Sequence, residues 1–337
     1  MSTLKKIYYK ACSLLPMSLF NSGGPAGLLL PYHHTVSNVE LPHISHLYGY
    51  KNVQQFSQDL DFLLKHYTPV SVTEIATAVS NKKSLPKNSF LLTFDDGFRE
   101  VFDIIAPVLE NKGVPAIFFI NPAFIDNKEL FYRCKISILI GELEKHKASF
   151  AEIFSGALQL PGAPVERLMD ALKKINQNNA TVLDEIARGI DYRFDDFLNR
   201  QQPFLTQAQL LSLHQRGFTI GAHSMDHPYY HLLPVAEQVN QTILSCRYVK
   251  ELLGTRECHF SFPHSDAPVL QETLNAINKL NDGLLFGIQN QKEELNNNML
   301  HRFNAERPET GIEMLIKGQV TLNRLQKIAG KNSVKRN

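Results

Sequence analysis

The sequence predicts an α/β fold in which helices cover a parallel sheet. Apolar runs of strand length alternate with helically spaced apolar residues over most of the 337 residues. Two of these runs, 90–94 and 116–120, are apolar throughout apart from Thr93, as expected of strands buried on both faces. A stretch of helix length, 99–112, lies between them and ends at Gly113, so this region predicts a compact βαβ unit.

The other elements are predicted in chain order by the same periodicities. A strand at 28–32 precedes a helix at 52–66, in which Val53, Phe56 and Leu60 recur at helical spacing. After residue 203 the predicted helices are 206–216, 235–253, 269–280 and 309–328, and the predicted strands are 218–222, 258–262 and 284–288. Gly217 and Gly254 follow the first two of these helices, where glycine commonly ends a helix.

The middle of the chain has a different pattern. From about 127 to 203 it is helical and polar with no clear strand, which predicts a helical insertion or a small lid. We therefore divide the chain into an N-terminal segment (1–27), a barrel with this insertion (28–305), and a C-terminal helix with a basic tail (306–337). The tail is expected to be solvated; its basic residues are Lys327, Lys331, Lys335 and Arg336.

Composition excludes several classes of protein. With 35 Lys and Arg against 33 Asp and Glu, the net charge of +2 gives no global field for holding nucleic acid. No apolar run is long enough to predict a transmembrane span, although peripheral contact with a membrane stays open. The four cysteines form no Cys-x-x-Cys pair and are expected to be small buried hydrophobic residues. The N-terminus is only weakly signal-like, so we expect a cytoplasmic protein, with export as the alternative.

Three polar clusters directly follow predicted strands: 32–34, 95–97 and 223–227. In α/β barrels the C-terminal ends of the strands form one face, where sites are assembled from distant segments. His223 and His227 are four apart, so on a helical turn both could reach one metal ion, or they could simply be satisfied or exposed histidines. Asp95 and Asp96 could supply a metal ligand and a base, or form a turn closed by Gly97.

Two motifs carry a resemblance to a known family. Thr93-Phe94-Asp95-Asp96-Gly97 together with His223-Ser224-x-x-His227 resembles the polysaccharide deacetylases, carbohydrate esterases with a NodB homology domain. The similarity extends through LLTFDDGFREVFDIIAPVLENKGVPAIFFI and LLSLHQRGFTIGAHSMDHP. The early LLLPYHH resembles the branch of poly-N-acetylglucosamine deacetylases, in which a Tyr-His precedes the core. The resemblance implies a distorted, TIM-like (β/α) barrel.

The resemblance also implies roles for individual residues. Asp96, His223 and His227 would bind one divalent ion, with zinc expected and cobalt or nickel as alternatives. Asp95 would act as general base and His33 as general acid, with His34 as the competing acid. The implied reaction is removal of the N-acetyl group from an amino sugar in a polysaccharide or surface-glycan precursor.

The chain departs from the family pattern in one loop. The Pro-Tyr-Gly of the family is Pro263-His264-Ser265 here, and Ser261 replaces an arginine that orients the base. Arg302 could supply that charge, or it could contact substrate together with His34, Pro263 and His264. This departure leaves two alternatives to deacetylation. One is a non-catalytic glycan-binding protein on the same barrel, and the other is a hydrolase of a different amide C–N bond.

Overall fold

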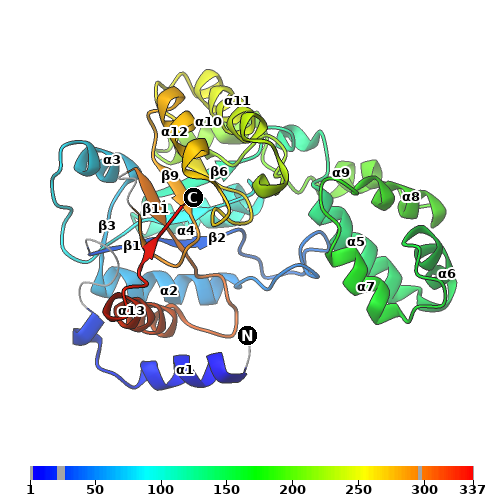
Figure 1. Cartoon of the computed structure of the whole chain (residues 1–337), viewed down its shortest axis with the longest axis horizontal. Coiled ribbons are helices and arrows are strands. Elements are labelled where there is room, and N and C mark those ends of the chain that lie inside the picture. Colours follow the sequence, from blue (N-terminus) through cyan, green and yellow to red (C-terminus); the bar gives the residue numbers. More distant parts are fainter. Residues whose placement is uncertain (1–2, 21–26, 295–297, 337) are drawn as a thin grey trace.

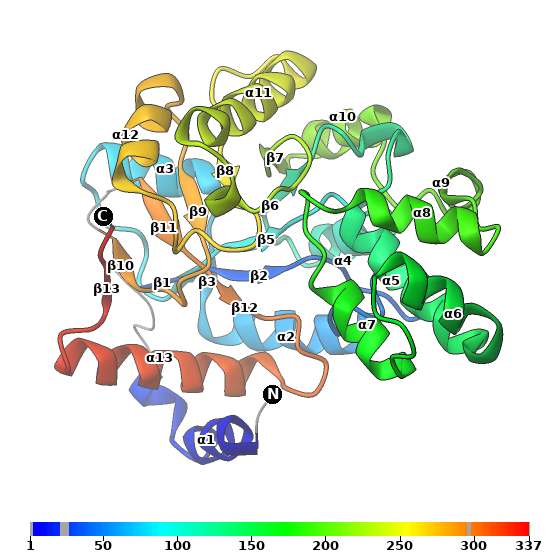
Figure 2. The same cartoon turned by 45° about the vertical axis from the view of Figure 1, so that its right-hand side comes forward.

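The computed structural model describes residues 3–20, 27–294 and 298–336, and a barrel of parallel strands lies at its centre (Figures 1 and 2). In this described part, eight strands form one sheet in the order β11-β9-β8-β7-β6-β5-β2-β12, and each neighbouring pair is parallel. The strands are β2 (Pro31–His33), β5 (Leu92–Phe94), β6 (Ala116–Ile120), β7 (Thr219–Ala222), β8 (Phe260–Ser261), β9 (Leu285–Gly287), β11 (Met299–His301) and β12 (Phe303–Asn304). The predicted α/β barrel is confirmed.

One short segment closes this barrel. Only Arg302 separates β11 from β12, yet the two strands pair with opposite edges of the sheet, β11 with β9 and β12 with β2. The amide of Arg302 donates to the carbonyl of Gly287 at 2.9 Å, and the amide of Phe303 donates to the carbonyl of Leu30 at 3.0 Å. The segment 299–304 is therefore the seam of the barrel, and Arg302 lies within it.

Two smaller parallel sheets flank the barrel. One has the order β1-β4-β3, and the other joins β10 to β13. Their strands are β1 (Leu28–Leu29), β3 (Thr68–Pro69), β4 (Ser89–Phe90), β10 (Glu293–Glu294) and β13 (Ser333–Val334). The predicted strands 28–32 and 90–94 are thus each split in two, because their first residues pair in the small sheet and their last residues pair in the barrel.

Helices surround the barrel, as Figure 2 shows. They are α1 (Thr3–Ser13), α2 (Val53–His66), α3 (Val72–Ser80), α4 (Ala106–Asn111), α10 (Gln207–Gln215), α11 (Val235–Leu253), α12 (Gln271–Leu280) and α13 (Ile312–Ile328), with short turns η1 (Met17–Phe20), η4 (Ile125–Asn127) and η5 (Tyr230–Leu232). The predicted helix 99–112 begins instead as a π-helical turn, η3 (Val101–Ile105), that continues into α4. Helices α2, α3 and α10 each begin with a capping box. In each, the side chain of the N-cap residue accepts from the backbone amide three residues later, and the side chain of that later residue accepts from the N-cap amide.

The stretch 127–203 is helical, and it projects to one side of the barrel in Figure 1. Its five helices are α5 (Tyr132–Lys145), α6 (Lys147–Ala157), α7 (Val165–Lys173), α8 (Thr181–Gly189) and α9 (Phe194–Gln201). Leu139, Phe154, Leu168 and Leu183, one from each of the first four helices, are fully buried in an apolar cluster distinct from the barrel core. The insertion therefore has a core of its own.

The C-terminal region packs onto the barrel. The amide of Ile312, at the start of α13, donates to Asp59 Oδ1 on α2 at 2.9 Å, and Asp59 is also paired with the buried Lys51.

Among the described residues, we find no helix with the length and apolarity needed to cross a bilayer. All four cysteines are buried and unbridged, as expected.

The expected solvation of the basic tail is wrong for Arg336. Its side chain is buried, and its guanidinium lies 2.8 Å from Asp266 Oδ2 and 2.9 Å from Glu294 Oε2. His301 Nε2 lies 3.3 Å from the same Glu294 carboxylate. Two buried carboxylates need a cation close by, and the tail supplies it. Lys327 is exposed, as expected.

Candidate active site

The three polar clusters meet in one pocket at the C-terminal ends of β2, β5 and β7. The pocket has a volume of about 190 Å³. Its polar lining consists of His34, Asp95, Asp96, His223, His227 and His264, with the charged Arg133 from α5. Its apolar and aromatic walls include Tyr32, Tyr48, Phe98, Phe131 and Phe262. The cavity is smaller than the usual site for a drug-sized ligand, so it suits a small group of a larger molecule.

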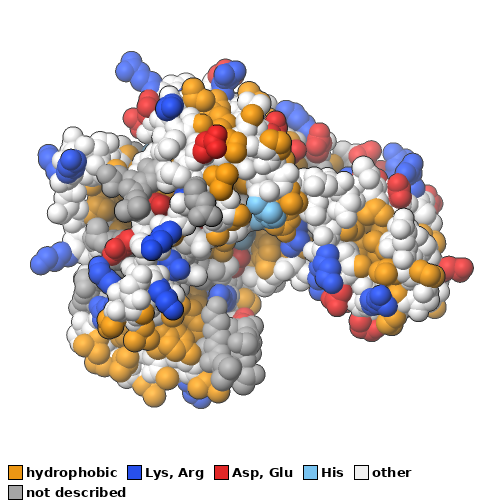
Figure 3. Space-filling view, viewed as in Figure 1, with side chains coloured by type: hydrophobic (Ala, Val, Ile, Leu, Met, Phe, Trp, Pro, Cys, Tyr) orange, Lys and Arg blue, Asp and Glu red, His pale blue; other side chains and the backbone are white. Residues whose placement is uncertain are grey.

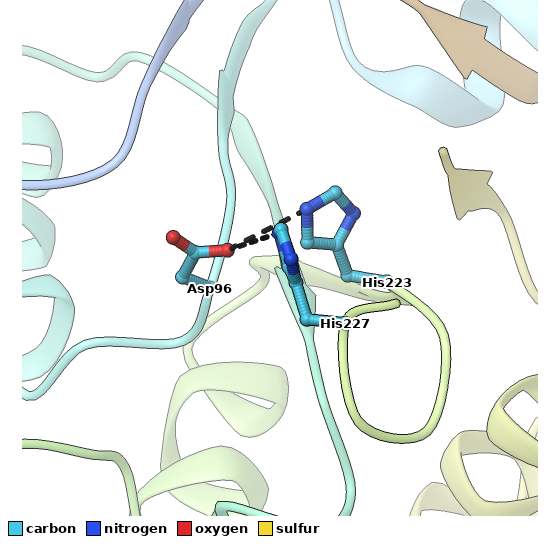
Figure 4. Close-up of side chains that lie close together, drawn as sticks. All are labelled: Asp96, His223 and His227. Atoms are coloured by element: carbon cyan, nitrogen blue, oxygen red, sulfur yellow. Dashed lines mark ion pairs between the residues drawn. The ribbon is translucent and has the colours of Figure 1, made fainter. Parts of the chain in front are cut away.

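Asp96, His223 and His227 point toward one another at the floor of the pocket (Figure 4). Asp96 Oδ1 lies 3.5 Å from His223 Nε2 and 3.2 Å from His227 Nε2. One potential ligand atom from each residue lies within 4.8 Å of the others, and all three residues are buried. Two imidazole nitrogens and one carboxylate oxygen form a donor set that could hold one divalent ion and leave a coordination position open.

The hydrogen bonding of Asp96 and the protonation of His223 also suit the binding of a cation. Asp96 Oδ1 is buried and has no hydrogen-bond partner, although two imidazoles lie beside it. His223 Nδ1 lies 2.8 Å from the carbonyl oxygen of Ser261, so Nδ1 carries the proton and Nε2 presents its lone pair. Burial lowers the pKa of His223 to about 4, which keeps the imidazole neutral at pH 7. A neutral imidazole is the form that binds metal.

The two histidines are brought together by a loop and not by the helical turn that their spacing predicts. Ser224 and His227 have left-handed backbones, with φ of 68° and 61°, which a continuing helix excludes. Ser224 Oγ accepts the amide proton of His227 at 3.1 Å. Asn121 Nδ2, at the end of β6, donates to the carbonyl of Ser224 at 3.1 Å and also to that of His223. Asn121 therefore fixes the loop to the barrel.

Asp95 is held by the seam of the barrel. Arg302 Nη1 and Nη2 donate to Asp95 Oδ1 and Oδ2 at 2.7 and 2.8 Å, a two-pronged pair with both partners buried. Burial alone would raise the pKa of Asp95, but the guanidinium of Arg302 lowers it overall. Because the side chain of Arg302 is fully buried and outside the pocket lining, its predicted substrate contact is wrong. The structure supports the alternative of an orienting charge.

His33 and His34 occupy opposite environments. His33 lies in the core, where its ring stacks on Phe94 and meets the edge of Phe56, and burial lowers its pKa well below the usual value. His34 lines the pocket, and its Nδ1 lies 2.8 Å from Glu306 Oε1. Burial alone would lower the pKa of His34, but the Glu306 carboxylate raises it to about 9. The general-acid role predicted for His33 therefore does not fit the structure, because His33 does not reach the pocket.

The loop that departs from the family pattern contributes one residue to the pocket. His264 stacks on Tyr229 with ring centroids 3.6 Å apart, and its Nε2 lies 3.2 Å from His227 Nδ1 and 3.2 Å from the hydroxyl of Tyr132. Pro263 is buried and absent from the pocket lining, so its predicted substrate contact is wrong. His264 thus lies behind a metal-ligand candidate and in contact with the insertion.

Sequence reasoning missed three residues that shape the site. Glu306 lies two residues after the end of β12, so the rule that strand ends form the site could have identified it if β12 had been predicted. Asn121 follows β6 and could have been found in the same way. Tyr48, whose ring lies 4.7 Å from that of His34, comes from an irregular loop that carries no sequence signal.

Comparisons with known proteins identify the family of this chain. The family model described as polysaccharide deacetylase matches residues 82–281, which is 200 of the 337 residues. No curated protein sequence gives a significant match to the chain.

Several solved structures share the fold. IcaB from Ammonifex degensii has a TM-score of 0.56 at 16% identity, covering 88% of this chain and 98% of its own. A de-N-acetylase from Aggregatibacter actinomycetemcomitans has a TM-score of 0.56 at 15% identity, covering 86% and 99%. The deacetylase PplD from Streptococcus pyogenes, solved with acetate, has a TM-score of 0.55 at 16% identity, covering 87% and 97%.

The contact between His264 and His227 predicts an effect on metal affinity. His264→Phe keeps a ring against Tyr229 but removes the nitrogen that faces His227 Nδ1, so we expect metal to bind about 10–100-fold more weakly. The dissociation constants of the purified proteins for Zn²⁺ and Co²⁺ are measured by competition with a chelator. His146→Phe, at an exposed position of the insertion, is the control and should bind like wild type. Equal affinities for all three proteins would contradict a positioning role of His264.

Proposed function

The chain belongs to the polysaccharide deacetylase family, and on that premise we propose that it is a metal-dependent hydrolase of N-acetylated amino sugars. Its substrate would be a polysaccharide or a surface-glycan precursor, and its products acetate and a free amine. The observation that carries this proposal is one pocket lined by a possible metal-ligand set, a buried carboxylate and a histidine paired with Glu306. In the cytoplasm, the location expected from the sequence, the substrate would be a precursor.

The proposed site uses one divalent ion held by Asp96, His223 and His227, with zinc as the proposed metal and cobalt or nickel as substitutes. When bound, such an ion polarises a carbonyl group and lowers the pKa of water. Two imidazoles and one carboxylate converge on one point, and the carboxylate oxygen among them has no hydrogen-bond partner. These features support the assignment of the three ligands.

Asp95 is the proposed general base. It takes a proton from water as the oxygen of that water adds to the acetyl carbon. Arg302 keeps the carboxylate ionised and orients both of its oxygens, so the base is ready at neutral pH. Since Arg302 also donates to Thr93 Oγ1 at 3.0 Å and to Ser261 Oγ at 2.6 Å, the guanidinium itself cannot turn.

His34, in place of His33, is the proposed general acid. The C–N bond breaks as the imidazolium gives its proton to the leaving nitrogen, which departs as an amine. Its Nδ1 is engaged by Glu306, so Nε2 is the nitrogen that can donate. A pKa of about 9 keeps the proton on the ring at neutral pH. A glycan-binding protein without catalysis would not need a histidine that is paired with a carboxylate in the pocket, which favours the enzyme.

Replacement of the base tests the proposal most directly. Asp95→Asn should lower kcat for acetate release by about 10²–10⁴-fold while metal stays bound, because Asn cannot accept the proton. Purified protein is assayed against acetylated sugars, lipid-linked glycans and small amides, and its metal content is measured in parallel. Unfolding in urea shows whether the uncompensated Arg302 has destabilised the variant. A folded, metal-loaded and fully active Asp95→Asn protein would refute the mechanism.

The two neighbouring histidines provide a matched comparison. His34→Gln should lower kcat by about 10²–10⁴-fold, because the leaving amine loses its proton donor. His33→Gln should leave kcat within about threefold of wild type in whatever fraction folds, because His33 faces the core. Active-site concentration is fixed by bound metal in both variants. Greater loss of kcat in the His33 variant than in the His34 variant would reverse the assignment.

Removal of the partner of the acid should change the pH profile. Activity requires ionised Asp95 and protonated His34, so kcat should fall at low pH through the lowered pKa of Asp95 and at high pH through the raised pKa of His34. The carboxylates of Glu306, Asp96 and Asp95 all raise the pKa of His34. Glu306→Gln removes the strongest of these, so the alkaline limb should move down by at least about one pH unit. Exposed Glu309→Gln is the control, and an unmoved limb in Glu306→Gln would contradict the pairing.

A further inference from the structure

The near-zero net charge of the chain conceals a strong asymmetry. Residues 1–39 and 314–337 together contain nine Lys and Arg and no Asp or Glu. The rest of the chain therefore has 35 − 9 = 26 basic residues against 33 acidic ones, a balance of −7. All nine of the basic residues at the two ends of the chain lie in α1, α13 and the segment after α13, and the first turn of α13 also contains Glu313, which is paired with Lys317.

These two ends lie against each other on one side of the barrel. The hydroxyl of Tyr8 on α1 donates to the carbonyl of Gly318 on α13 at 2.7 Å. Arg324 on α13 donates to the carbonyl of Leu19 in η1 at 2.6 Å, and its guanidinium lies over the ring of Phe20. A Cβ on Gly318 would fall 2.2 Å from the ring of Tyr9, so α1 approaches α13 as closely as glycine permits. The two segments therefore form one surface.

This surface exposes large apolar side chains. They are Ile7, Leu14, Leu15 and Leu19 from the first segment and Leu325 and Ile328 from α13. Leu14 and Ile328 are 84% and 85% exposed, close to the value for a free chain. Figure 3 shows apolar side chains gathered over α1, η1 and α13, with Lys and Arg around them. Lys10, Lys327 and Lys331 are exposed beside them. We call these nine residues the basic apolar face.

We propose that the basic apolar face binds the surface of an anionic membrane, with the leucines and isoleucines entering the headgroup region and the lysines contacting acidic lipids. Exposed apolar residues beside lysines are the pattern of a peripheral membrane element. α1, at 11 residues, can lie along a bilayer surface. A second copy of this chain fits less well, because pairing two such faces would bring like charges together. Nucleic acid also fits less well, because it would contact the lysines but would leave the exposed leucines without an apolar partner.

Binding to vesicles tests this proposal on the full-length protein. Vesicles are made of phosphatidylcholine alone or with about 30% phosphatidylglycerol, and bound protein is measured by sedimentation. We expect binding to the anionic vesicles and a clear loss of it at 0.5 M salt. Leu14→Glu/Leu325→Glu should weaken binding by at least about tenfold, because two apolar contacts become anionic. Lys327→Gln/Lys331→Gln should weaken it by about fivefold or more.

Matched controls separate the face from general surface effects. Leu270→Glu/Leu280→Glu makes the same change at exposed leucines at the two ends of α12, which lies on the opposite side of the barrel in Figure 1. Lys82→Gln/Lys83→Gln removes two exposed lysines elsewhere. Both controls should bind like wild type. Equal losses in controls and test variants, or no preference of wild type for anionic vesicles, would overturn the proposal.

Light scattering addresses the remaining alternative. A wild-type dimer that Leu14→Glu/Leu325→Glu converts to monomer, without vesicle binding, would assign the face to self-association and overturn membrane binding. The basic apolar face contains no residue of the pocket, so acetate release from a soluble substrate should be unchanged in every variant. Vesicle binding is measured without substrate. The membrane proposal and the proposed deacetylase function can therefore fail independently.

Discussion

The buried pair between Arg302 and Asp95 is the interaction on which both the barrel and its pocket depend. Arg302 lies between the two strands that close the barrel. Its guanidinium contacts Thr93 on β5, Asp95 just after β5, and Ser261 on β8. Two opposite charges out of water are stable only together, since removal of either leaves the other buried and unpaired. One side chain, that of Arg302, therefore ties the closing strands to β5 and β8 and keeps the proposed base ionised.

The pair also explains how two adjacent carboxylates can be buried at the same strand end. Asp95 faces Arg302, and Asp96 faces the two histidines, so each anion has cationic or metal-binding partners of its own. Asp96 has a left-handed backbone conformation, with φ of 72°, so the side chains of Asp95 and Asp96 point in different directions. Gly97 follows with φ of 65°, and a Cβ there would lie 3.0 Å from Ile120 Cγ2 on β6. The turn therefore requires glycine for conformation and for space.

Much of the architecture could be predicted from the sequence because its signals are local. Continuous apolar runs identified β6, and helical spacing with a following glycine identified α11 to the residue. The strands β11 and β12 were missed because His301, Arg302 and Asn304 interrupt the apolar pattern of 299–304, and both strands depend on pairing with distant ones. α3 was missed as well, although its Ser71 and Glu74 form a recognisable capping box.

The motif residues of the site were predictable from the sequence, but the residues that contact and orient them were not. Asp95, Asp96, His223 and His227 lie in two short motifs, so the sequence alone brought them forward. Which of His33 and His34 faces the pocket depends on the orientation of β2 in the barrel, which alternates from one residue to the next and cannot be deduced from a two-histidine pattern. Glu306 became visible only once the seam had placed it beside His34.

The separate apolar core of the insertion has a consequence for how this protein can change over evolutionary time. Its helices pack on one another in that core, while Phe131 at its beginning lines the pocket and the hydroxyl of Tyr132 contacts His264. Sequence drift within that bundle can leave the strands undisturbed and still change the side of the pocket that Phe131, Arg133 and Cys134 form. New specificities can therefore arise by exchange of this bundle, with the hydrolytic machinery beneath it inherited intact.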